Sequence, residues 1–409
     1  MTSTDLSSIP AIPAPDQTER VILRALEEEG GTGCPCDLLV LGDTTGALTA
    51  AALELVAAQP EARVRSWSTS RAETRRLAAL LPDALAEGRL VLPTGVEPVP
   101  LEDFAAAADA HLVLARLPKS LAALEDLARR LAVADARSGR DDLTLVAGGR
   151  VKHMTRSQND ALAAVFAEVR GSRGLGKSRA LIASALRTDV DAAEPALAET
   201  LVRVRGQERS LALRGLGGVF GGARADAGSL LLLGALDAAL AGGELTPEGG
   251  GAGDEDAAEA RQASALPLAI DLGCGNGLLT AYLAAALPGI RVLGSDDDSD
   301  AVASTRATLS ASGLDHGGVE VSWDESLSQA ADDSADLVLL NPPFHDGTVV
   351  DATLVQGLLD AAARVLRPGG QLWFVHNSHL RYRSELEARF GLVRQRARDR
   401  RFTVLSAVA

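Results

Sequence analysis

The chain has 409 residues, a length typical of two or three domains of roughly 100–200 residues each. Apolar residues make up 46% of it and charged residues 23%, which excludes a wholly disordered protein. No apolar run reaches the roughly 18 residues that a membrane-spanning helix needs, so we expect no membrane partner. The net charge of −15 argues against a protein that coats nucleic acids non-specifically, and three cysteines favour the cytoplasm because they are too few for a disulfide framework.

In chain order, residues 1–20 come first and are rich in Ser, Thr and Pro, which predicts a flexible tail. From residue 21 onwards, short apolar runs alternate with Ala-, Leu- and Arg-rich segments of helical spacing. Strands that alternate with helices predict an α/β fold with a mostly parallel sheet. Residues 242–265 interrupt the pattern with many glycines and six acidic side chains, and predict a flexible acidic loop.

Four blocks of the first half align with four blocks of the second half at nearly constant offsets of 231, 228, 225 and 229 residues. The pairs are LGDTTGALTA (41–50) with LGCGNGLLTA (272–281), RVRSWS (63–68) with RVLGSD (291–296), HLVLARLPK (111–119) with DLVLLNPPF (336–344), and LTLVAGG (143–149) with LWFVHNS (372–378). The repeat predicts two tandem Rossmann-like domains, 21–205 and 206–409. The alternative is the general likeness of any two doubly wound domains.

The two copies differ where strands are predicted to end. The second copy has Asp271 and Asp296 where the first has Val40 and Ser68. It also has Asn341-Pro342-Pro343-Phe344 where the first has Arg116-Leu117-Pro118-Lys119. Because ligands of open α/β sheets bind at the carboxyl ends of the strands, we expect a silent first domain and a catalytic second domain.

A glycine-rich turn follows the first predicted strand of the second domain. Its glycines are Gly273, Gly275 and Gly277, with Asp271 two residues before them. Glycine permits a tight turn and a close approach of the backbone to a ligand. The G-x-G-x-G spacing is one residue shorter than that of the dinucleotide fingerprint, so the turn alone predicts a cofactor site without naming the cofactor.

The next predicted strand ends in an acidic cluster. Asp296 could bind two ribose hydroxyls through its two oxygens, and Asp297 beside it is the alternative residue for this role. A plain helix N-cap is the structural alternative for the cluster. Asp324, after the apolar segment VEVSW, is a candidate for binding the amino group of an adenine, or an ordinary loop aspartate.

The sharpest motif is Asn341-Pro342-Pro343-Phe344-His345, directly after the apolar run DLVLL. Two prolines stop strand pairing and stiffen the turn. The Asn341 amide oxygen and the Pro342 carbonyl can then accept both hydrogens of one planar amino group. Phe344 can stack on a base, and His345 either takes up the released proton or only packs.

Two further patterns are open to a functional and a structural interpretation. Arginines dominate residues 381–401, and we expect Arg394, Arg396 and Arg398 to contact RNA phosphates unless they belong to a solvated surface. Residues 171–178 fit the phosphate-loop pattern G-x-x-x-x-G-K-S, but that motif needs a preceding buried strand. The apolar spacing over 162–169 predicts a helix there instead, and the basic turn with Lys177 could touch RNA.

The chain resembles class I S-adenosylmethionine methyltransferases, and within them the ribosomal RNA guanine-N2 methyltransferases of the RsmC/RlmG type, from about residue 21 to the end. The motifs DLGCGNG, DAVASTR, NPPFHDG, HNSHLRY and RFTVLSAV carry the resemblance, and the last two favour the large-subunit members. Residues 218–232 match the segment that covers the cofactor in the family, with Phe220, Asp226 and Gly228 in place. Gly222 stands where the family usually has an arginine.

The resemblance implies two methyltransferase-type domains, the second ending in an antiparallel hairpin, with an RNA-recognising first domain. It implies S-adenosylmethionine as cofactor, bound by Asp271, the three glycines and Asp296 with Asn341. The expected reaction transfers a methyl group to the N2 amine of a flipped-out guanosine in ribosomal RNA, by direct displacement without a nucleophilic side chain. We expect no metal and a monomer.

Two other functions fit parts of the sequence. The N-P-P-aromatic motif also occurs in enzymes that methylate adenine N6 or a protein glutamine, although the His-Asp-Gly that follows it and the silent first copy favour guanine. A non-catalytic RNA-binding assembly factor is the third interpretation. The intact Asp271, Asp296 and Asn341 argue against it.

Overall fold

The computed structural model describes residues 12–30, 36–108, 110–219, 221–244, 267–343 and 352–409. The chain divides into two compact units, residues 1–194 and 195–409. Most of the acidic loop predicted at 242–265 lies outside the described residues, as do Phe220, Phe344 and His345. Each unit is described by itself.

Unit 1 is a seven-stranded sheet in the order β3-β2-β1-β4-β5-β7-β6. Its strands are β1 (Asp37–Leu41), β2 (Val64–Trp67), β3 (Leu90–Val91), β4 (Ala110–Arg116), β5 (Thr144–Arg150), β6 (Phe166–Gly171) and β7 (Ser178–Leu186). Its helices are α1 (Gln17–Glu28), α2 (Ala47–Leu55), α3 (Arg71–Leu80), α4 (Pro82–Ala86), α5 (Leu101–Ala106), α6 (Leu121–Ser138) and α7 (Arg156–Ala163), with the 3₁₀ turn η2 (Val151–His153). The strands from β3 to β5 are parallel, whereas β7 is antiparallel to both β5 and β6.

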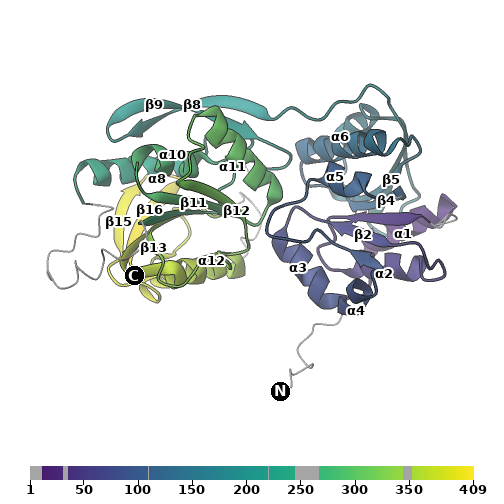
Figure 1. The fold of residues 1–409 in the computed structure, drawn as a ribbon, viewed down its shortest axis with the longest axis horizontal. Helices are drawn as coiled ribbons and strands as arrows, with labels where there is room; N and C mark the ends of the chain where they lie inside the picture. The colour runs from purple at the N-terminus through teal and green to yellow at the C-terminus, as the bar shows by residue number, and fades with distance from the viewer. Residues whose placement is uncertain (1–11, 31–35, 109, 220, 245–266, 344–351) are drawn as a thin grey trace, which may run out of the picture. The chain divides into compact units, whose positions relative to one another are not determined.

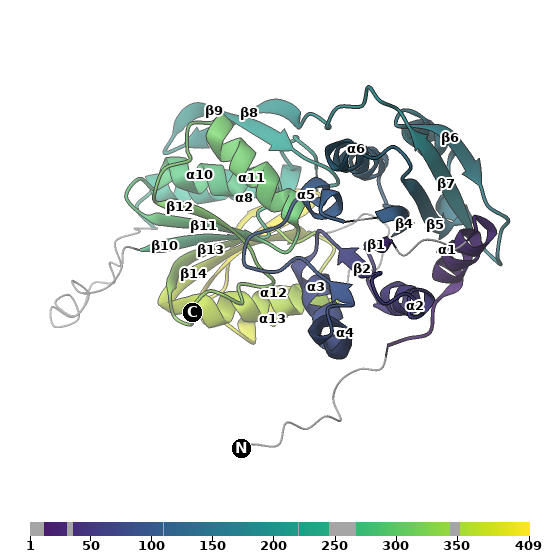
Figure 2. The ribbon, with the colours of Figure 1, turned by 45° about the vertical axis from the view of Figure 1, so that its right-hand side comes forward.

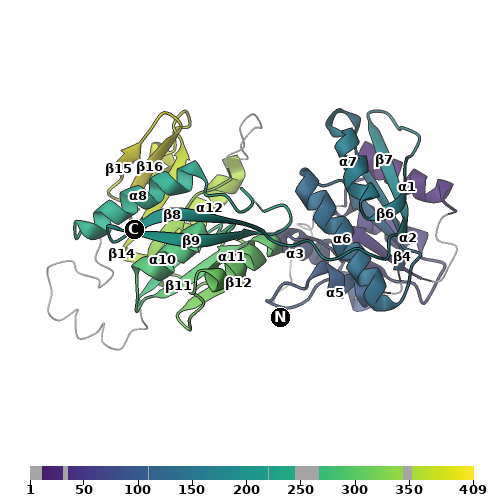
Figure 3. The same ribbon diagram turned by 90° about the horizontal axis from the view of Figure 1, so that it is seen from above.

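Unit 2 repeats this layout in the order β12-β11-β10-β13-β14-β16-β15. Its strands are β10 (Leu268–Leu272), β11 (Arg291–Asp296), β12 (Val319–Trp323), β13 (Ala335–Leu340), β14 (Leu366–Asn377), β15 (Arg394–Arg398) and β16 (Phe402–Val408). Its helices are α8 (Ala227–Ala241), α10 (Leu278–Ala286), α11 (Ser299–Ala311), α12 (Ala352–Val365) and α13 (Arg383–Glu387). A separate hairpin, β8 (Ala196–Val204) and β9 (Gln207–Gly215), belongs to the same unit and lies beside α10 and α11 (Figure 3).

The predicted duplication is confirmed strand by strand. The first pair of aligned blocks begins at the last residues of β1 and β10, and the other three pairs overlap β2 and β11, β4 and β13, and β5 and β14. These strands take equivalent places in the two sheets. The antiparallel hairpin expected at the end of the second domain is present, and the first domain ends in the same way. The α/β fold with two mostly parallel sheets is therefore correct.

Two predicted boundaries differ from the structure. The division between the units lies at 194 and 195 rather than at 205 and 206, because β8 pairs along its whole length with β9 and cannot be separated from it. The tail predicted over 1–20 ends earlier, because α1 begins at Gln17. The Asp16 carboxylate accepts hydrogen bonds from the backbone of Thr18 and Glu19 and so fixes the start of that helix.

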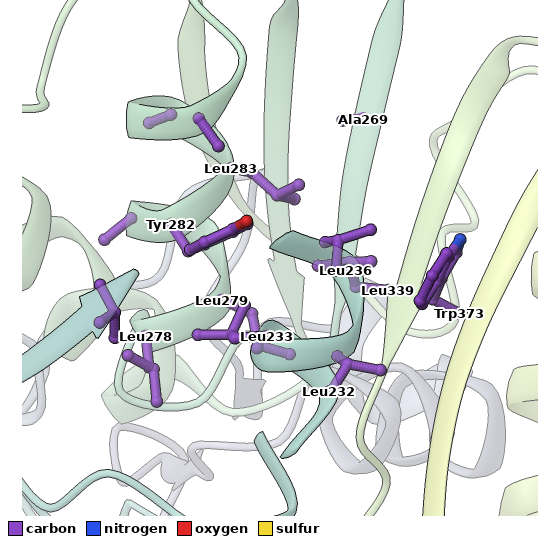
Figure 4. Close-up of a cluster of buried hydrophobic side chains, with 14 of the residues drawn as sticks. Leu232, Leu233, Leu236, Ala269, Leu278, Leu279, Tyr282, Leu283, Leu339 and Trp373 are labelled. Carbon is purple, nitrogen blue, oxygen red and sulfur yellow. The ribbon is translucent and has the colours of Figure 1, made fainter. Parts of the chain in front are cut away.

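Alternating side chains of the central strands of unit 2 enter two cores. Leu339 and Trp373 pack with α8 and α10 on one face of the sheet, while Leu340 and Phe374 pack with α12 on the other face (Figures 1 and 4). In unit 1, α1 and α2 cover one face of the sheet and α5 to α7 the other, and Figure 2 shows α1 against β5 and β7. Within the described residues, no helix is both long and apolar enough to cross a membrane.

Candidate active site

The glycine turn joins β10 to α10 at the carboxyl edge of the second sheet. Gly273, Gly275 and Gly277 have φ values of 82°, 54° and 81°, in the left-handed region that side chains rarely adopt. A β-carbon added at Gly273 or Gly275 would meet no atom within 4 Å, so the space beside these two residues is open. At Gly277 it would lie 2.8 Å from the backbone of Thr305, so this glycine allows α11 to approach closely.

Asn276 connects the glycine turn to two neighbouring segments. Its side-chain amide donates hydrogen bonds to the carbonyls of Gly222 and Arg224, at 2.9 and 3.0 Å. Its own carbonyl accepts a hydrogen bond of 2.7 Å from the Thr308 hydroxyl on α11. The segment before α8 is thereby fixed beside the turn. The family resemblance predicts that this segment lies near the cofactor, but no sequence motif singles out Asn276.

Asp271 is fully buried under the turn. One carboxylate oxygen accepts a hydrogen bond of 2.6 Å from Thr280, while the other, Oδ1, has no hydrogen-bond partner among the described residues. Burial raises the pKa of Asp271 to about 7, and the nearby Asp296 adds to the effect. A buried oxygen without a partner is suited to a ligand that carries a positive charge or a hydrogen-bond donor.

Asp296 is the last residue of β11. Its carboxylate accepts hydrogen bonds from the backbone of Gly275, at 2.9 Å, and of Asp298, at 3.0 Å, so it is tied to the glycine turn. Burial raises its pKa to about 6. The helix N-cap considered for this cluster is Asp298, which receives the Asp300 N–H at 2.8 Å. Asp297 is half-buried, and its carbonyl accepts a hydrogen bond from the Trp323 indole.

Asp324 is buried and bonded within its own loop. Its two carboxylate oxygens accept hydrogen bonds from the Ser328 hydroxyl, at 2.5 Å, and from the Gln329 backbone, at 2.9 Å. Its own N–H donates to the carbonyl of Asp296. These contacts close the loop that follows β12, and the adenine-binding role of Asp324 stays a prediction.

Asn341 follows the last residue of β13, so the predicted strand end is correct. Its amide nitrogen donates two hydrogen bonds, at 2.9 Å to the Asp226 carboxylate and at 2.8 Å to the Ser229 hydroxyl. Among the described residues, none donates a hydrogen bond to its Oδ1. Pro342 is buried and Pro343 exposed. No sequence motif predicts the contacts to Asp226 and Ser229.

The three arginines of β15 do not share one environment. Arg394 and Arg398 are exposed. Arg396 instead donates to the Ser406 hydroxyl at 2.7 Å and forms an ion pair of 2.6 Å with Glu244, with its guanidinium over the Trp373 ring. Arg396 thus stabilises the sheet, whereas Arg394 and Arg398 present their guanidinium groups to solvent.

Two family models match the chain in succession, the RLMG N-terminal domain over residues 7–187 and the methyltransferase small domain over residues 258–406. A Streptomyces coelicolor protein, "Ribosomal RNA large subunit methyltransferase G", is 31% identical over 379 residues, which are 91% of this chain and 88% of that protein. The chain belongs to this methyltransferase family. Its Shewanella amazonensis relative of the same name is 28% identical and covers 98% of this chain and 94% of its own.

A solved structure extends the family similarity to the whole fold. The T. thermophilus 16S rRNA N2 G1207 methyltransferase (RsmC), in complex with AdoMet and guanosine, superposes with a TM-score of 0.67 at 26% identity. The match covers 96% of this chain and 92% of that one. Both class I folds of the methyltransferase chain are therefore established, and the resemblance inferred from the motifs is confirmed.

The described residues of the two units differ at the end of the fourth strand of each sheet. In unit 1, Arg116 takes the place of Asn341 at the end of β4 and forms ion pairs with Glu19 at 2.8 Å and with Asp16 at 3.3 Å. Glu19 is only 1% exposed. This ion-pair cluster occupies the position where the second unit has the amide of Asn341.

Proposed function

We propose that the protein transfers a methyl group from S-adenosylmethionine to the exocyclic N2 amine of a guanosine in large-subunit ribosomal RNA. The observation that carries the proposal is the half-buried side chain of Asn341. Its nitrogen donates hydrogen bonds to Asp226 and Ser229, while its Oδ1 accepts no hydrogen bond from the described residues. The names of the relatives, which refer to the large ribosomal subunit, and the guanosine-bound RsmC structure support the choice of substrate.

The residues around the glycine turn fit the cofactor. Gly273 and Gly275 border open space, Asp271 has a buried oxygen without a hydrogen-bond partner among the described residues, and Asp296 ends the neighbouring strand. When bound, S-adenosylmethionine supplies a methyl group on a positively charged sulfur. The Asp296 carboxylate would accept hydrogen bonds from the ribose hydroxyls, and Asp271 would face the positively charged part of the molecule. Asp297 is the alternative ribose ligand.

Asn341 and Pro342 would hold the target amine. An amine attached to an aromatic ring is a weak nucleophile because its lone pair is delocalised into the ring. The Asn341 Oδ1 and the Pro342 carbonyl would accept its two hydrogens and turn the lone pair towards the methyl donor. Attack by the amine nitrogen would break the bond between the methyl group and sulfur, with S-adenosylhomocysteine as the leaving group, and the amine would lose one proton to water. Phe344 would stack on the base.

Unit 1 would bind RNA without taking part in the chemistry. The turn around Lys177 lies against η2, where the Val151 N–H donates to the Lys177 carbonyl at 2.9 Å. Exposed cations gather on these two neighbouring segments: Arg150, Lys152, Arg156, Arg173, Lys177 and Arg179. On a chain of net charge −15, such a cluster is suited to RNA phosphates. Within unit 2, the exposed Arg394 and Arg398 would be a separate candidate for contacts with RNA phosphates.

Nucleoside analysis of ribosomal RNA tests the proposal. Large- and small-subunit RNA from cells with and without the gene is digested to nucleosides and measured by mass spectrometry. We expect loss of N2-methylguanosine from the large-subunit RNA alone, with restoration by the wild-type gene. Unchanged N2-methylguanosine in both subunits contradicts the proposed function.

A further inference from the structure

We propose that Asp226 and Ser229 are positioning residues, which fix the side-chain amide of Asn341 in the one orientation that turns its oxygen towards the substrate. This inference rests on the proposed function and adds two residues to its site. It starts from the two hydrogen bonds of 2.9 and 2.8 Å that the Asn341 nitrogen donates to Asp226 and Ser229.

The direction of the amide follows from hydrogen-bond chemistry. An asparagine amide has an acceptor end and a donor end of nearly equal size, and it can turn over about its terminal torsion. An ionised carboxylate only accepts hydrogen bonds, so Asp226 can face only the nitrogen of Asn341. A serine hydroxyl could pair with either end, so the carboxylate decides the orientation and Ser229 completes it.

The carboxylate is itself held in place. Asp226 is the N-cap of α8, and its Oδ2 also accepts the Ser229 N–H at 2.9 Å. The first turns of α8 are anchored in the core through Leu232 and Leu233, which are 0% and 3% exposed (Figure 4). A cap fixed to a buried helix gives Asn341 a rigid partner, which a mobile surface carboxylate would not.

Unit 1 has an equivalent arrangement with another residue at the end of the strand. We call this arrangement the frame: a helix N-cap and the residue three positions later, both bonded to a residue at the end of the fourth strand. Asp16 is the N-cap of α1 and Glu19 follows three residues later, as Asp226 and Ser229 do on α8. Both carboxylates of unit 1 bind the Arg116 guanidinium at the end of β4. In each unit, therefore, the N-cap residue and the residue three positions after it both bind a side chain at the end of the fourth strand. This side chain is Arg116 in unit 1 and Asn341 in unit 2. The second unit uses this frame to orient an amide.

The wrong orientation would oppose the reaction. If the amide turned over, its NH₂ group would face the substrate amine, and two donors would meet where the mechanism needs a donor and an acceptor. The electrostatic attraction that holds the amine would disappear, while the groups that face the cofactor, Asp271 and Asp296, would remain in place. The expected signature of replacing Asp226 is a lower kcat with unchanged cofactor affinity.

The first experiment compares Asp226→Ala with Asp226→Asn and Ser229→Ala in the full-length protein. For Asp226→Ala we expect kcat for ribosomal RNA to fall roughly 10- to 100-fold, as is typical when a reacting group is misplaced. The Kd of S-adenosylhomocysteine should change less than about twofold. Asp226→Asn keeps an oxygen for both the helix cap and Asn341 and should recover most of the activity. Ser229→Ala should show a smaller loss.

A matched control separates positioning from helix capping. Ser120 is an exposed N-cap of α6 in unit 1, where its hydroxyl accepts the Ala123 N–H at 3.1 Å. Ser120→Ala removes a cap of the same kind without touching the Asn341 frame, so kcat should stay at the wild-type value. Thermal unfolding of each variant shows that it is folded at the assay temperature.

A charge exchange tests the coupling directly. Asn341→Asp places two carboxylates against each other and should lower kcat at least about 100-fold, since like charges at this distance repel. Adding Asp226→Asn to it restores a hydrogen bond in the reverse direction, because the amide at position 226 donates and the carboxylate at position 341 accepts. The double variant should therefore recover kcat about tenfold or more. A double variant no more active than Asn341→Asp, or a folded Asp226→Ala variant with wild-type kcat, overturns the inference.

Hydrogen exchange of the Asn341 side-chain amide does not depend on methyl transfer, so it tests this inference separately from the proposed function. In protein labelled with ¹⁵N at asparagine, the Asn341 NH₂ protons should exchange slowly with solvent in the wild type and rapidly in Asp226→Ala. Equal exchange in both proteins contradicts the frame itself. A wild-type enzyme that methylates no ribosomal RNA contradicts the proposed function instead, and the exchange result still decides the inference.

Discussion

The Arg116 guanidinium lies 3.3 Å from the Asp16 carboxylate, in the same frame in which Asn341 binds Asp226 in the second unit. One fold, present twice in the chain, thus has one strand end closed by an ion pair and one that presents an amide oxygen. We propose that methyl transfer takes place at the second strand end, and the predictions below follow from the groups that surround it.

Replacing Asn341 should separate chemistry from cofactor binding. Asn341→Ala removes one of the two acceptors proposed for the target amine, and kcat should fall about 100-fold or more, the usual cost of one preorganised polar contact in an active site. The Kd of S-adenosylhomocysteine, measured by calorimetry, should remain within about twofold of the wild type. Turnover near the wild-type value would remove Asn341 from the mechanism.

Replacing Asp296 should have the opposite effect. A carboxylate that accepts two ribose hydroxyls contributes charge-assisted hydrogen bonds, so Asp296→Ala should weaken S-adenosylhomocysteine binding roughly 10- to 100-fold. Asp297→Ala is the comparison, with an expected change below about threefold. If the Asp297 variant loses affinity and the Asp296 variant keeps it, the ribose ligand is Asp297.

The buried carboxyl group of Asp271 should lower the free energy of unfolding of the ligand-free protein when it is ionised. Its pKa is about 7 in the folded protein and 3.8 for a free side chain, so the folded protein holds its proton more tightly than the unfolded chain. Its contribution therefore favours folding at low pH and is lost as the pH rises from about 4 to about 7. Asp271→Asn should raise the free energy of unfolding at pH 8, by at most about 4 kcal/mol, and leave it unchanged near pH 4.

Chemical denaturation at the two pH values measures this effect. The variant should also bind S-adenosylhomocysteine more weakly, because the negative charge beneath the turn is gone. A stability difference between the variant and the wild type that is the same at both pH values would show that Asp271 does not titrate in this window.

The ion-pair cluster of unit 1 should be structural. Arg116→Ala leaves the 1%-exposed Glu19 without its cation and should lower the free energy of unfolding of unit 1 by about 2–4 kcal/mol. Adding Glu19→Gln should recover part of this loss. Trp67 is the tryptophan of unit 1, so its fluorescence in a Trp323→Phe/Trp373→Phe background follows that unit. Equal stability with and without Arg116 would contradict a structural role for the cluster.

The β15 arginines should affect RNA binding unequally. Replacing Arg394 and Arg398 with glutamine should reduce the slope of log K against log salt concentration by about 0.7 for each phosphate that is no longer neutralised. Arg396→Gln should leave the slope unchanged and lower the thermal stability, because its guanidinium is bound by Glu244 and Ser406. An unchanged slope for the double variant would remove β15 from the RNA interface.

The strand ends of the second domain were predictable because their signals are local. Glycines with positive φ, an acid at the end of β11 and Asn341 before two prolines each lie within a few residues of the strand that positions them. The duplication was predictable for the same reason, since the strand sequences repeat at a nearly constant offset.

The hydrogen bonds of Asn341 to Asp226 and Ser229 could not be predicted from the sequence, because these partners are distant in the chain. Asp226 lies 115 residues from Asn341, and no pattern in either segment predicts a contact between them. Local spacing also misled at 162–169, where the predicted helix is the end of α7 followed by β6. Val165 and Phe166 are both buried, but Phe166 begins β6, which pairs with β7, so tertiary packing prevailed over helical periodicity.

The central claim is tested most directly by methyl transfer to purified large-subunit ribosomal RNA in vitro. Wild-type enzyme and Asn341→Ala are incubated with this RNA and S-adenosylmethionine that carries an isotopically labelled methyl group, and the digested nucleosides are analysed by mass spectrometry. We expect label in N2-methylguanosine with the wild type and none above background with the variant. Label on adenosine or on protein, or equal labelling by both enzymes, would contradict it.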